Sequence, residues 1–183
     1  FAVTGEATPT GLAAPQLDGS SNTTVLVTWQ PPMQPNGVIR SYTILRSASG
    51  GGSFVVVFVG LTQSYRDSDA SLIPAMTYEY KLVATNGAGN VSSPLAIITL
   101  PETPPRLVPT PLIQNVTSTS FLVLVTPPGL PNGVLTMYNL YLNELLRSNT
   151  SVVSSSVVFS VTALNPYTFY SIQLEACNKA GCG

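Results

Sequence analysis

The chain has 183 residues, a net charge of −1, and charged side chains at only 8% of its positions, whereas an average globular protein has about 25%. This composition supplies neither a basic surface for nucleic acid nor an acidic tail for basic partners. The chain contains no histidine, which excludes Ser-His and Cys-His catalytic pairs and the usual zinc ligand sets. It also lacks the run of about 18 apolar residues that a membrane span needs. We therefore expect no enzyme, no cofactor, no nucleic-acid binding and no membrane insertion.

Short runs rich in Val, Thr, Tyr and Leu follow one another along the chain, separated by turns rich in Pro, Gly, Asn and Ser. This pattern is typical of an all-β sandwich. Period-two alternation places Trp29, Tyr42 and Tyr78 on the core faces of their strands. In the first half of the chain we expect strands near 23–29, 41–46, 54–59, 64–69, 78–85 and 94–100.

Two proline-rich turns join predicted strands. The first lies in "PPMQPNGVIRSY", which begins at Pro31, and the second in "PPGLPNGVLTMY", which begins at Pro127. The Pro-Pro pair cannot continue a central strand because proline donates no ladder hydrogen bond, and Asn-Gly suits the positive φ angles of a tight turn. Each motif therefore ends one strand and precedes the next.

These motifs belong to a tandem repeat. The two proline-rich turns lie 96 residues apart, whereas Leu72 and its counterpart Leu164 lie 92 residues apart. The second copy is therefore four residues shorter between Tyr138 and Leu164, a difference that a loop can absorb. Each copy has the size of a small single-core domain, so the sequence predicts two domains. Tyr138 repeats Tyr42, but Val125 stands where Trp29 stands, so we expect the second core to be filled differently.

The order of these motifs resembles the fibronectin type III family over nearly the whole chain. Leu72-x-Pro74-x-x-x-Tyr78 and Leu164-x-Pro166-x-x-x-Tyr170 are similar to its tyrosine corner, where the phenol bonds back to nearby backbone. The resemblance implies two tandem seven-strand, immunoglobulin-like sandwiches, the second lacking its last strand. The expected divisions are the end of a preceding domain and linker at 1–10, a domain at 11–100, a semi-rigid proline-rich linker at 101–106 and a domain at 107–183.

A narrower resemblance concerns "PYTFYSIQLEACNKAGC", "YNLYLNELL" and "GEATPTGLAAPQL". These segments are similar to repeats of a very large basement-membrane and sensory-cell protein built largely from fibronectin type III domains. That resemblance implies an extracellular setting at basement membranes, stereocilia links or photoreceptors. It also implies collagen, fibronectin or other adhesion proteins as partners of the whole protein, together with neighbouring fibronectin type III domains.

Cys177 and Cys182 enclose four residues of a predicted hairpin. Alternation points Cys177 away from the core face, and cross-strand partners lie about 4.5 to 5.5 Å apart, which suits a disulfide. We expect this bond in an oxidising compartment, and the alternative is two free thiols. Four glycosylation sequons fall in predicted loops or at strand ends and, with the cysteine pair, favour the secretory route with at least two glycans attached. The sequon residues are Asn22, Asn90, Asn115 and Asn149.

The run "FVVVFV" at 54–59 is apolar on both faces, although only one face of a strand enters a two-layer core. Val55 and Val57, together with Leu122 and Leu124 on the outward face of their strand, therefore predict an exposed contact patch. The alternative is a strand covered by its own loops or glycans. Asp67-x-Asp69 is the only close acidic pair, and two carboxylates fall short of the about six to eight oxygens that calcium takes, so no metal site is expected.

The sequence favours a non-catalytic extracellular spacer and protein-interaction segment of a large multidomain adhesion or matrix protein. A ligand-binding receptor ectodomain is one alternative, although the "WSxWS" box of cytokine receptors is absent. An intracellular structural array is another, in which the sequons and the cysteine pair would be accidental. An enzyme accessory domain would need an aromatic binding platform, which one core tryptophan does not supply. No "RGD" motif supports integrin binding.

Overall fold

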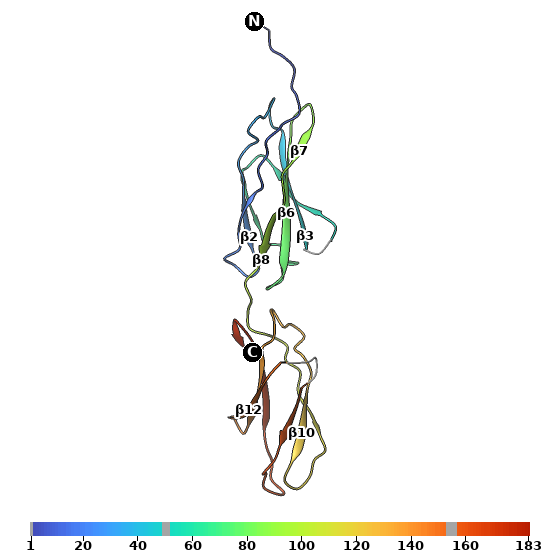
Figure 1. The fold of residues 1–183 in the computed structure, drawn as a ribbon, viewed down its shortest axis with the longest axis vertical. Helices are drawn as coiled ribbons and strands as arrows, with labels where there is room; N and C mark the ends of the chain where they lie inside the picture. The colour runs from blue at the N-terminus through green and yellow to red at the C-terminus, as the bar shows by residue number, and fades with distance from the viewer. Residues whose placement is uncertain (1, 49–51, 153–156) are drawn as a thin grey trace. The chain divides into compact units, whose positions relative to one another are not determined.

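The computed structural model describes residues 2–48, 52–152 and 157–183. The chain divides into two compact units, Phe1–Pro101 and Glu102–Gly183, called unit 1 and unit 2 below. Strands and turns make up both units, and no helix occurs in the described ranges (Figure 1). These ranges accordingly contain no helix that is long and apolar enough to cross a membrane.

Unit 1 consists of two antiparallel sheets. One has the order β1-β2-β5, and the other has the order β4-β3-β6-β7 with β8 also paired to β6. Pro94, which donates no ladder bond, lies in the gap between β7 and β8, so these two strands are successive pieces of one strand. The strands are β1 (Gln16–Asp18), β2 (Val25–Thr28), β3 (Ser41–Ala48), β4 (Val55–Gly60), β5 (Ser64–Asp67), β6 (Thr77–Thr85), β7 (Asn90–Ser92) and β8 (Ala96–Thr99).

The core of unit 1 lies between its two sheets. Along β6, buried residues alternate with partly buried ones, as the sequence pattern predicts for a strand with one face in the core. Trp29 packs against the rings of Tyr42 and Phe58, with both centroids 5.8 Å away. The two sheets therefore meet over a core that includes Trp29.

Unit 2 repeats this arrangement with sheets of order β13-β10-β9 and β12-β11-β14-β15. Its core cluster includes Phe121, Val123, Tyr138 and Phe159. Val125 occupies the position of Trp29 and is 1% exposed. The strands are β9 (Leu112–Gln114), β10 (Phe121–Val125), β11 (Met137–Leu142), β12 (Leu145–Ser151), β13 (Val157–Val161), β14 (Ile172–Asn178) and β15 (Gly181–Cys182).

The hairpin between β11 and β12 is shorter than its counterpart in unit 1. Leu142 pairs with Leu145, so only Asn143 and Glu144 form the turn, and both have positive φ angles of 51° and 66°. This is the backbone of a tight two-residue hairpin. In unit 1 the equivalent pair is Arg46 and Val55, with eight residues between them. This turn is six residues shorter, which exceeds the four-residue difference between the copies, so the second copy is two residues longer elsewhere between Tyr138 and Leu164.

Unit 2 also has an open sheet edge. In unit 1, β8 pairs with residues 77–80 of β6. The equivalent residues of unit 2 are 169–172, of which Ile172 pairs with Leu142 of β11, and no described strand pairs with them on the side that β8 takes in unit 1. Tyr167 and Phe169 are fully exposed. Beside them is a groove of about 530 Å³ lined by Ile113, Leu164 and Ile172.

Candidate functional site: two N-terminal clasps, a disulfide and an exposed strand

Each unit begins with an extended segment that is tied to its Pro-Asn-Gly turn. In unit 1, Ala7 N donates to Asn36 O at 2.9 Å and Thr10 N to Gln34 O at 2.9 Å. The Asn36 side chain returns a bond through Nδ2 to Thr8 O at 2.8 Å. In this way three residues of the initial segment are held by one turn.

Buried Asn86 joins this segment to a second turn. Its Nδ2 donates to Ala7 O at 2.6 Å and to Pro35 O at 3.0 Å. Its Oδ1 accepts from Ala88 N at 2.9 Å and Gly89 N at 3.1 Å in its own hairpin turn. One amide thus links three segments that are distant in sequence, with both ends of its dipole satisfied.

Glu6 completes the arrangement in unit 1. Its carboxylate accepts from Val38 N at 3.0 Å, and the guanidinium of Arg40 lies 3.5 Å away. The hydrogen bond from Val38 N–H is the largest influence and lowers the pKa of Glu6. Desolvation opposes it, and a bond from Gly87 N–H and the charge of Arg40 lower the pKa further. We call Glu6, Asn36 and Asn86 the N-terminal clasp of unit 1.

Unit 2 carries the same clasp in Glu102, Asn132 and Asn178. Asn178 Nδ2 donates to Thr103 O at 2.6 Å and to Pro131 O at 3.1 Å. Asn132 Nδ2 donates to the carbonyl of the proline after Thr103 at 3.1 Å. The carboxylate of Glu102 accepts from the backbone N–H of the residue after Asn178 at 3.2 Å and from that of Val134 at 3.4 Å.

The glycine of each Pro-Asn-Gly motif is required by the clasp. Gly37 and Gly133 have φ angles of 151° and 153°, in the region that favours glycine. A Cβ on Gly37 would lie 2.7 Å from Glu6 Cγ, and one on Gly133 would lie 2.5 Å from Glu102 Cδ. The motif recurs because each turn must both bend sharply and leave room for a carboxylate.

The clasps change the expected domain divisions. Residues 1–10 and 101–106 were expected to lie outside the two domains, but Pro9 and Pro105 are buried and the segments around them bond to units 1 and 2 respectively. These segments are held by backbone hydrogen bonds to the turns. A linker prediction that uses composition does not detect such bonds. The sequence does contain one sign of the clasps, because Glu6 and Asn86 recur in the second copy at the repeat spacing.

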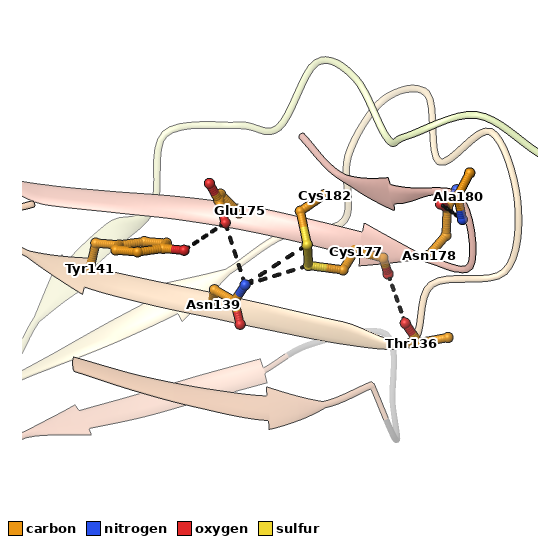
Figure 2. The surroundings of a disulfide bond; sticks show 8 residues. All are labelled: Thr136, Asn139, Tyr141, Glu175, Cys177, Asn178, Ala180 and Cys182. Atoms are coloured by element: carbon orange, nitrogen blue, oxygen red, sulfur yellow. Dashed lines mark hydrogen bonds between the residues drawn. A yellow bond between two sulfur atoms is a disulfide. The ribbon is translucent and has the colours of Figure 1, made fainter. Parts of the chain in front are cut away.

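Cys177 and Cys182 face each other across β14 and β15 and form a disulfide with Cα atoms 4.0 Å apart (Figure 2). Ala176 and Gly183 exchange two backbone hydrogen bonds at 3.0 Å, which makes the adjacent cysteines a non-hydrogen-bonded pair, the closer type in an antiparallel ladder. Asn178 pairs with Gly181, so the turn between the strands has two residues. The disulfide therefore closes the tip of the hairpin that supplies the unit 2 clasp.

The outward side chain of Cys177 is covered rather than exposed. It is 3% exposed, and Asn139 Nδ2 lies 3.5 Å from its Sγ. The same Asn139 amide donates to Glu175 at 3.3 Å, and Tyr141 donates to the same carboxylate oxygen at 2.8 Å (Figure 2). The bond to Glu175 raises the pKa of Tyr141. Asn139, Tyr141 and Glu175 thus form a polar network beside the disulfide.

Both expected tyrosine corners have hydrogen bonds to nearby backbone. Tyr78 Oη accepts from Ile73 N at 2.8 Å and donates to Ser71 O at 3.0 Å. Tyr170 Oη accepts from Asn165 N at 2.8 Å. Leu72 is buried, whereas Pro74 and Leu164 are partly buried and Pro166 is exposed.

The four sequon residues lie at accessible positions. Asn90 begins β7, Asn115 follows β9 and Asn149 lies within β12, and all three are exposed. Asn22 is partly buried in the turn before β2. Glycan attachment at each of them stays a prediction.

Of the four residues expected in the exposed apolar patch, only Val55 is exposed, and Val57, Leu122 and Leu124 are partly buried. Ile44 pairs with Phe58 and Leu45 with Val56, so Val57 is the extra residue of a β-bulge and packs against the core. The exposed residues of β4 are Val55, Val56 and Val59, at 51%, 58% and 62%. Leu122 and Leu124 are partly buried on β10. A bulge cannot be read from alternation, because it shifts the alternation by one residue.

Asp67 and Asp69 both contact the guanidinium of Arg46. Asp67 is fully buried and accepts from Arg46 Nη1 at 2.7 Å and from Tyr80 Oη at 2.9 Å. Asp69 lies 3.5 Å from the same guanidinium. No group of three potential metal ligands occurs in the described ranges.

The sequence profile of the Fibronectin type III domain matches residues 7–98 and 104–183. The chain belongs to the fibronectin type III family. Units 1 and 2 are its two fibronectin type III domains, and the predicted all-β fold class is confirmed.

Relatives of these fibronectin type III domains include usherin of Mus musculus, which is 34% identical over 189 residues. The alignment covers 96% of this chain but 4% of usherin, so the chain spans a small part of that protein. This confirms the narrower resemblance, since usherin is the protein whose repeats the quoted segments resemble. Netrin receptor DCC of Homo sapiens is 27% identical over 166 residues, covering 87% of this chain and 11% of the receptor. The crystal structure of chicken CNTN1 FN1-FN3 domains matches with a TM-score of 0.46 and 21% identity, over 98% of this chain and 65% of that chain.

Proposed function

We propose that this segment is a non-catalytic spacer and protein-interaction segment of a large extracellular adhesion or matrix protein. The observation that carries the proposal is the N-terminal clasp, which occurs in both units with the same residue types and contacts. A spacer must hold the chain where one domain follows another, and the clasps bond the initial segment of each domain to two of its turns.

The connection between the units supports the spacer role. Pro101 O accepts from Ala75 N of unit 1 at 3.3 Å. The next residue, Glu102, is bonded to two turns of unit 2. Consecutive residues are thus bonded to different domains, Pro101 to unit 1 and Glu102 to unit 2.

The extracellular setting is supported by three independent features. Cys177 and Cys182 are disulfide-bonded, and disulfides persist mainly in oxidising compartments. The four sequons lie on accessible positions. The chain is also similar to usherin and to a netrin receptor. By analogy with usherin, we propose basement-membrane or sensory-cell contexts, with collagen, fibronectin or other adhesion proteins as partners of the whole protein.

A ligand-binding receptor ectodomain is the second candidate, because the chain is 27% identical to Netrin receptor DCC over 87% of its length. The two candidates differ in what they bind. A receptor ectodomain binds a soluble ligand at a fixed stoichiometry. A spacer segment that is immobilised alone on a surface does not bind a soluble ligand in this way.

The proposal is tested by the intact mass of the segment secreted from mammalian cells. Mass is measured before and after glycosidase, and alkylation is compared with and without reductant. We expect glycan on at least two sequons, no alkylation without reductant and two alkylated thiols after reduction. A variant with Asn→Gln at all four sequons is the control. An unglycosylated protein with two free thiols would contradict the extracellular assignment and favour the intracellular array.

A further inference from the structure

Strand β4 is a bare edge of the larger sheet in unit 1. It ends the order β4-β3-β6-β7, so one of its sides pairs with β3 and the other pairs with no described strand. Val56 and Val59 are more than half exposed on it. The segment from Gly52 to Tyr65 contains no charged residue and no proline. An edge of this kind is a template for pairing with another strand.

The equivalent strand of unit 2 is protected against pairing with a further strand. Strand β12 ends its own sheet in the same way and has a bulge at the same place. The extra residue there is Arg147, where unit 1 has Val57. Because Thr43 pairs with Val59 and its counterpart Asn139 pairs with Asn149, the sequon residue occupies the position of Val59.

A charge or a glycan on an edge strand obstructs the approach of a second strand. Unit 2 thus has both a cationic side chain and a sequon on the edge where unit 1 has two valines. The sequons of unit 1 do not cover β4, since Asn22 precedes β2 and Asn90 lies on β7 at the opposite end of the sheet order. The two homologous edges are therefore opposite in character.

We propose that β4 is a self-association edge, at which β4 of a second copy of this chain adds antiparallel and continues the sheet. A second copy is favoured because the edge is self-complementary. Antiparallel pairing of two identical edges gives a closed two-fold contact. It brings no like charges together, because the strand has none, and it covers the exposed valines of both copies with one another. Strand β4 has no charged residue to which a partner of opposite charge could bind.

Sedimentation equilibrium of the secreted two-unit protein, from about 1 μM to about 1 mM, tests the proposal. We expect a reversible dimer. Val59→Asn together with Leu61→Thr copies the sequon of β12 onto β4, and the glycosylated variant should dimerise at least about tenfold more weakly. Val56→Lys should weaken the dimer without a glycan. The matched control is Leu146→Lys, which places the same charge at the equivalent position of β12 and should leave the dimer unchanged.

Hydrogen exchange locates the contact independently of these variants. Backbone amides of 55–60 should become protected as the protein concentration rises, while those of β12 should not. The proposal is overturned if the protein is monomeric across the range, if the Leu146→Lys variant weakens the dimer as much as Val56→Lys does, or if protection appears on another element. Binding of a different protein at β4 without dimerisation would also overturn it.

Discussion

The two fibronectin type III domains of this chain fill one equivalent site in opposite ways. In unit 1, Arg46, Asp67 and Tyr80 form a buried polar network. Across neighbouring strands of unit 1, Arg46 pairs with Tyr80 and Val25 pairs with Asp67. The equivalent pairs in unit 2 are Leu142 with Ile172 and Phe121 with Val161. The polar triad of one domain is therefore an apolar triad, Leu142, Val161 and Ile172, in the other.

This difference shows which part of the site the fold requires. Two sheets need a filled volume between them, and either a satisfied ion pair or three aliphatic side chains can fill it. A buried ion pair is costly to break but often contributes little net stability compared with apolar residues of similar size. Each residue of the polar triad thus needs the other two to stay in place, whereas the sandwich fold does not depend on the triad.

The largest effect is expected from Asp67→Ala. This change leaves the charge of Arg46, whose side chain is 7% exposed, without its buried partner, and breaking such a pair costs about 3 to 5 kcal/mol. The measurement is urea unfolding of unit 1, followed by the fluorescence of Trp29, the only tryptophan in the chain.

The matched control for Asp67→Ala transfers the unit 2 residues as a set, with Arg46→Leu, Asp67→Val and Tyr80→Ile. We expect the free energy of unfolding of this triple variant to stay within about 2 kcal/mol of the parent. A triple variant that loses as much stability as Asp67→Ala would contradict the comparison.

Trp29→Val gives unit 1 the residue that unit 2 has at the same position. Trp29 is 3% exposed and its Nε1 has no hydrogen-bond partner, so the loss is one of packing, about 2 to 4 kcal/mol. Scanning calorimetry checks this, because the variant has no tryptophan to follow. An unchanged unfolding temperature would mean that Phe58 and Tyr42 close the cavity by themselves.

Asn178→Ala should weaken the clasp of unit 2. It removes the amide that donates to the carbonyls of Thr103 and Pro131, at a cost of about 1 to 3 kcal/mol. Because these hydrogen bonds are lost, hydrogen exchange at the backbone amide of Arg106 should become faster. Asn115→Gln, at an exposed position, is the control and should leave that amide unchanged.

Reduction of the Cys177–Cys182 disulfide should have a smaller effect. The bond closes a loop with a sequence separation of 5, so it restricts the unfolded chain less than the about 3 kcal/mol expected for a 15-residue loop. Unit 1 forms the equivalent hairpin with Thr85 opposite Asn90 and no disulfide. We expect faster exchange in β14 and β15 upon reduction, with unit 2 still folded. Complete unfolding of unit 2 on reduction would show that the two hairpins are not comparable.

The smallest effect concerns pH and Glu6. Its pKa is lowered in the folded state from the ordinary 4.5, so its bonds stabilise the clasp above that pH and are lost as the pH falls through the lowered value. The amide of Val38 should therefore exchange faster in acid than neighbouring amides after correction for intrinsic rates. Glu6→Gln should remove this pH dependence, and an identical profile in the variant would exclude Glu6 as its source.

Much of the candidate site could be predicted, and the exceptions have physical causes. The cysteine pair, the tyrosine corners and the sequons lie within short motifs, where spacing alone brings groups together. The clasp joins segments as distant as Ala7 and Asn86, a contact that no local pattern contains. Val57 was misplaced because a bulge reverses the face of every residue beyond it.

The sequence by itself determined the all-β class, the tandem repeat and core positions such as Trp29, Tyr42 and Tyr78, because alternation and turn chemistry are local properties of the chain. Only the tertiary structure decided that Glu6 and Glu102 occupy the space left by glycines, that Arg46 is paired with Asp67, and that β4 is an edge. Each of these depends on which strands become neighbours, and the free energy of that choice is shared among residues far apart in the sequence.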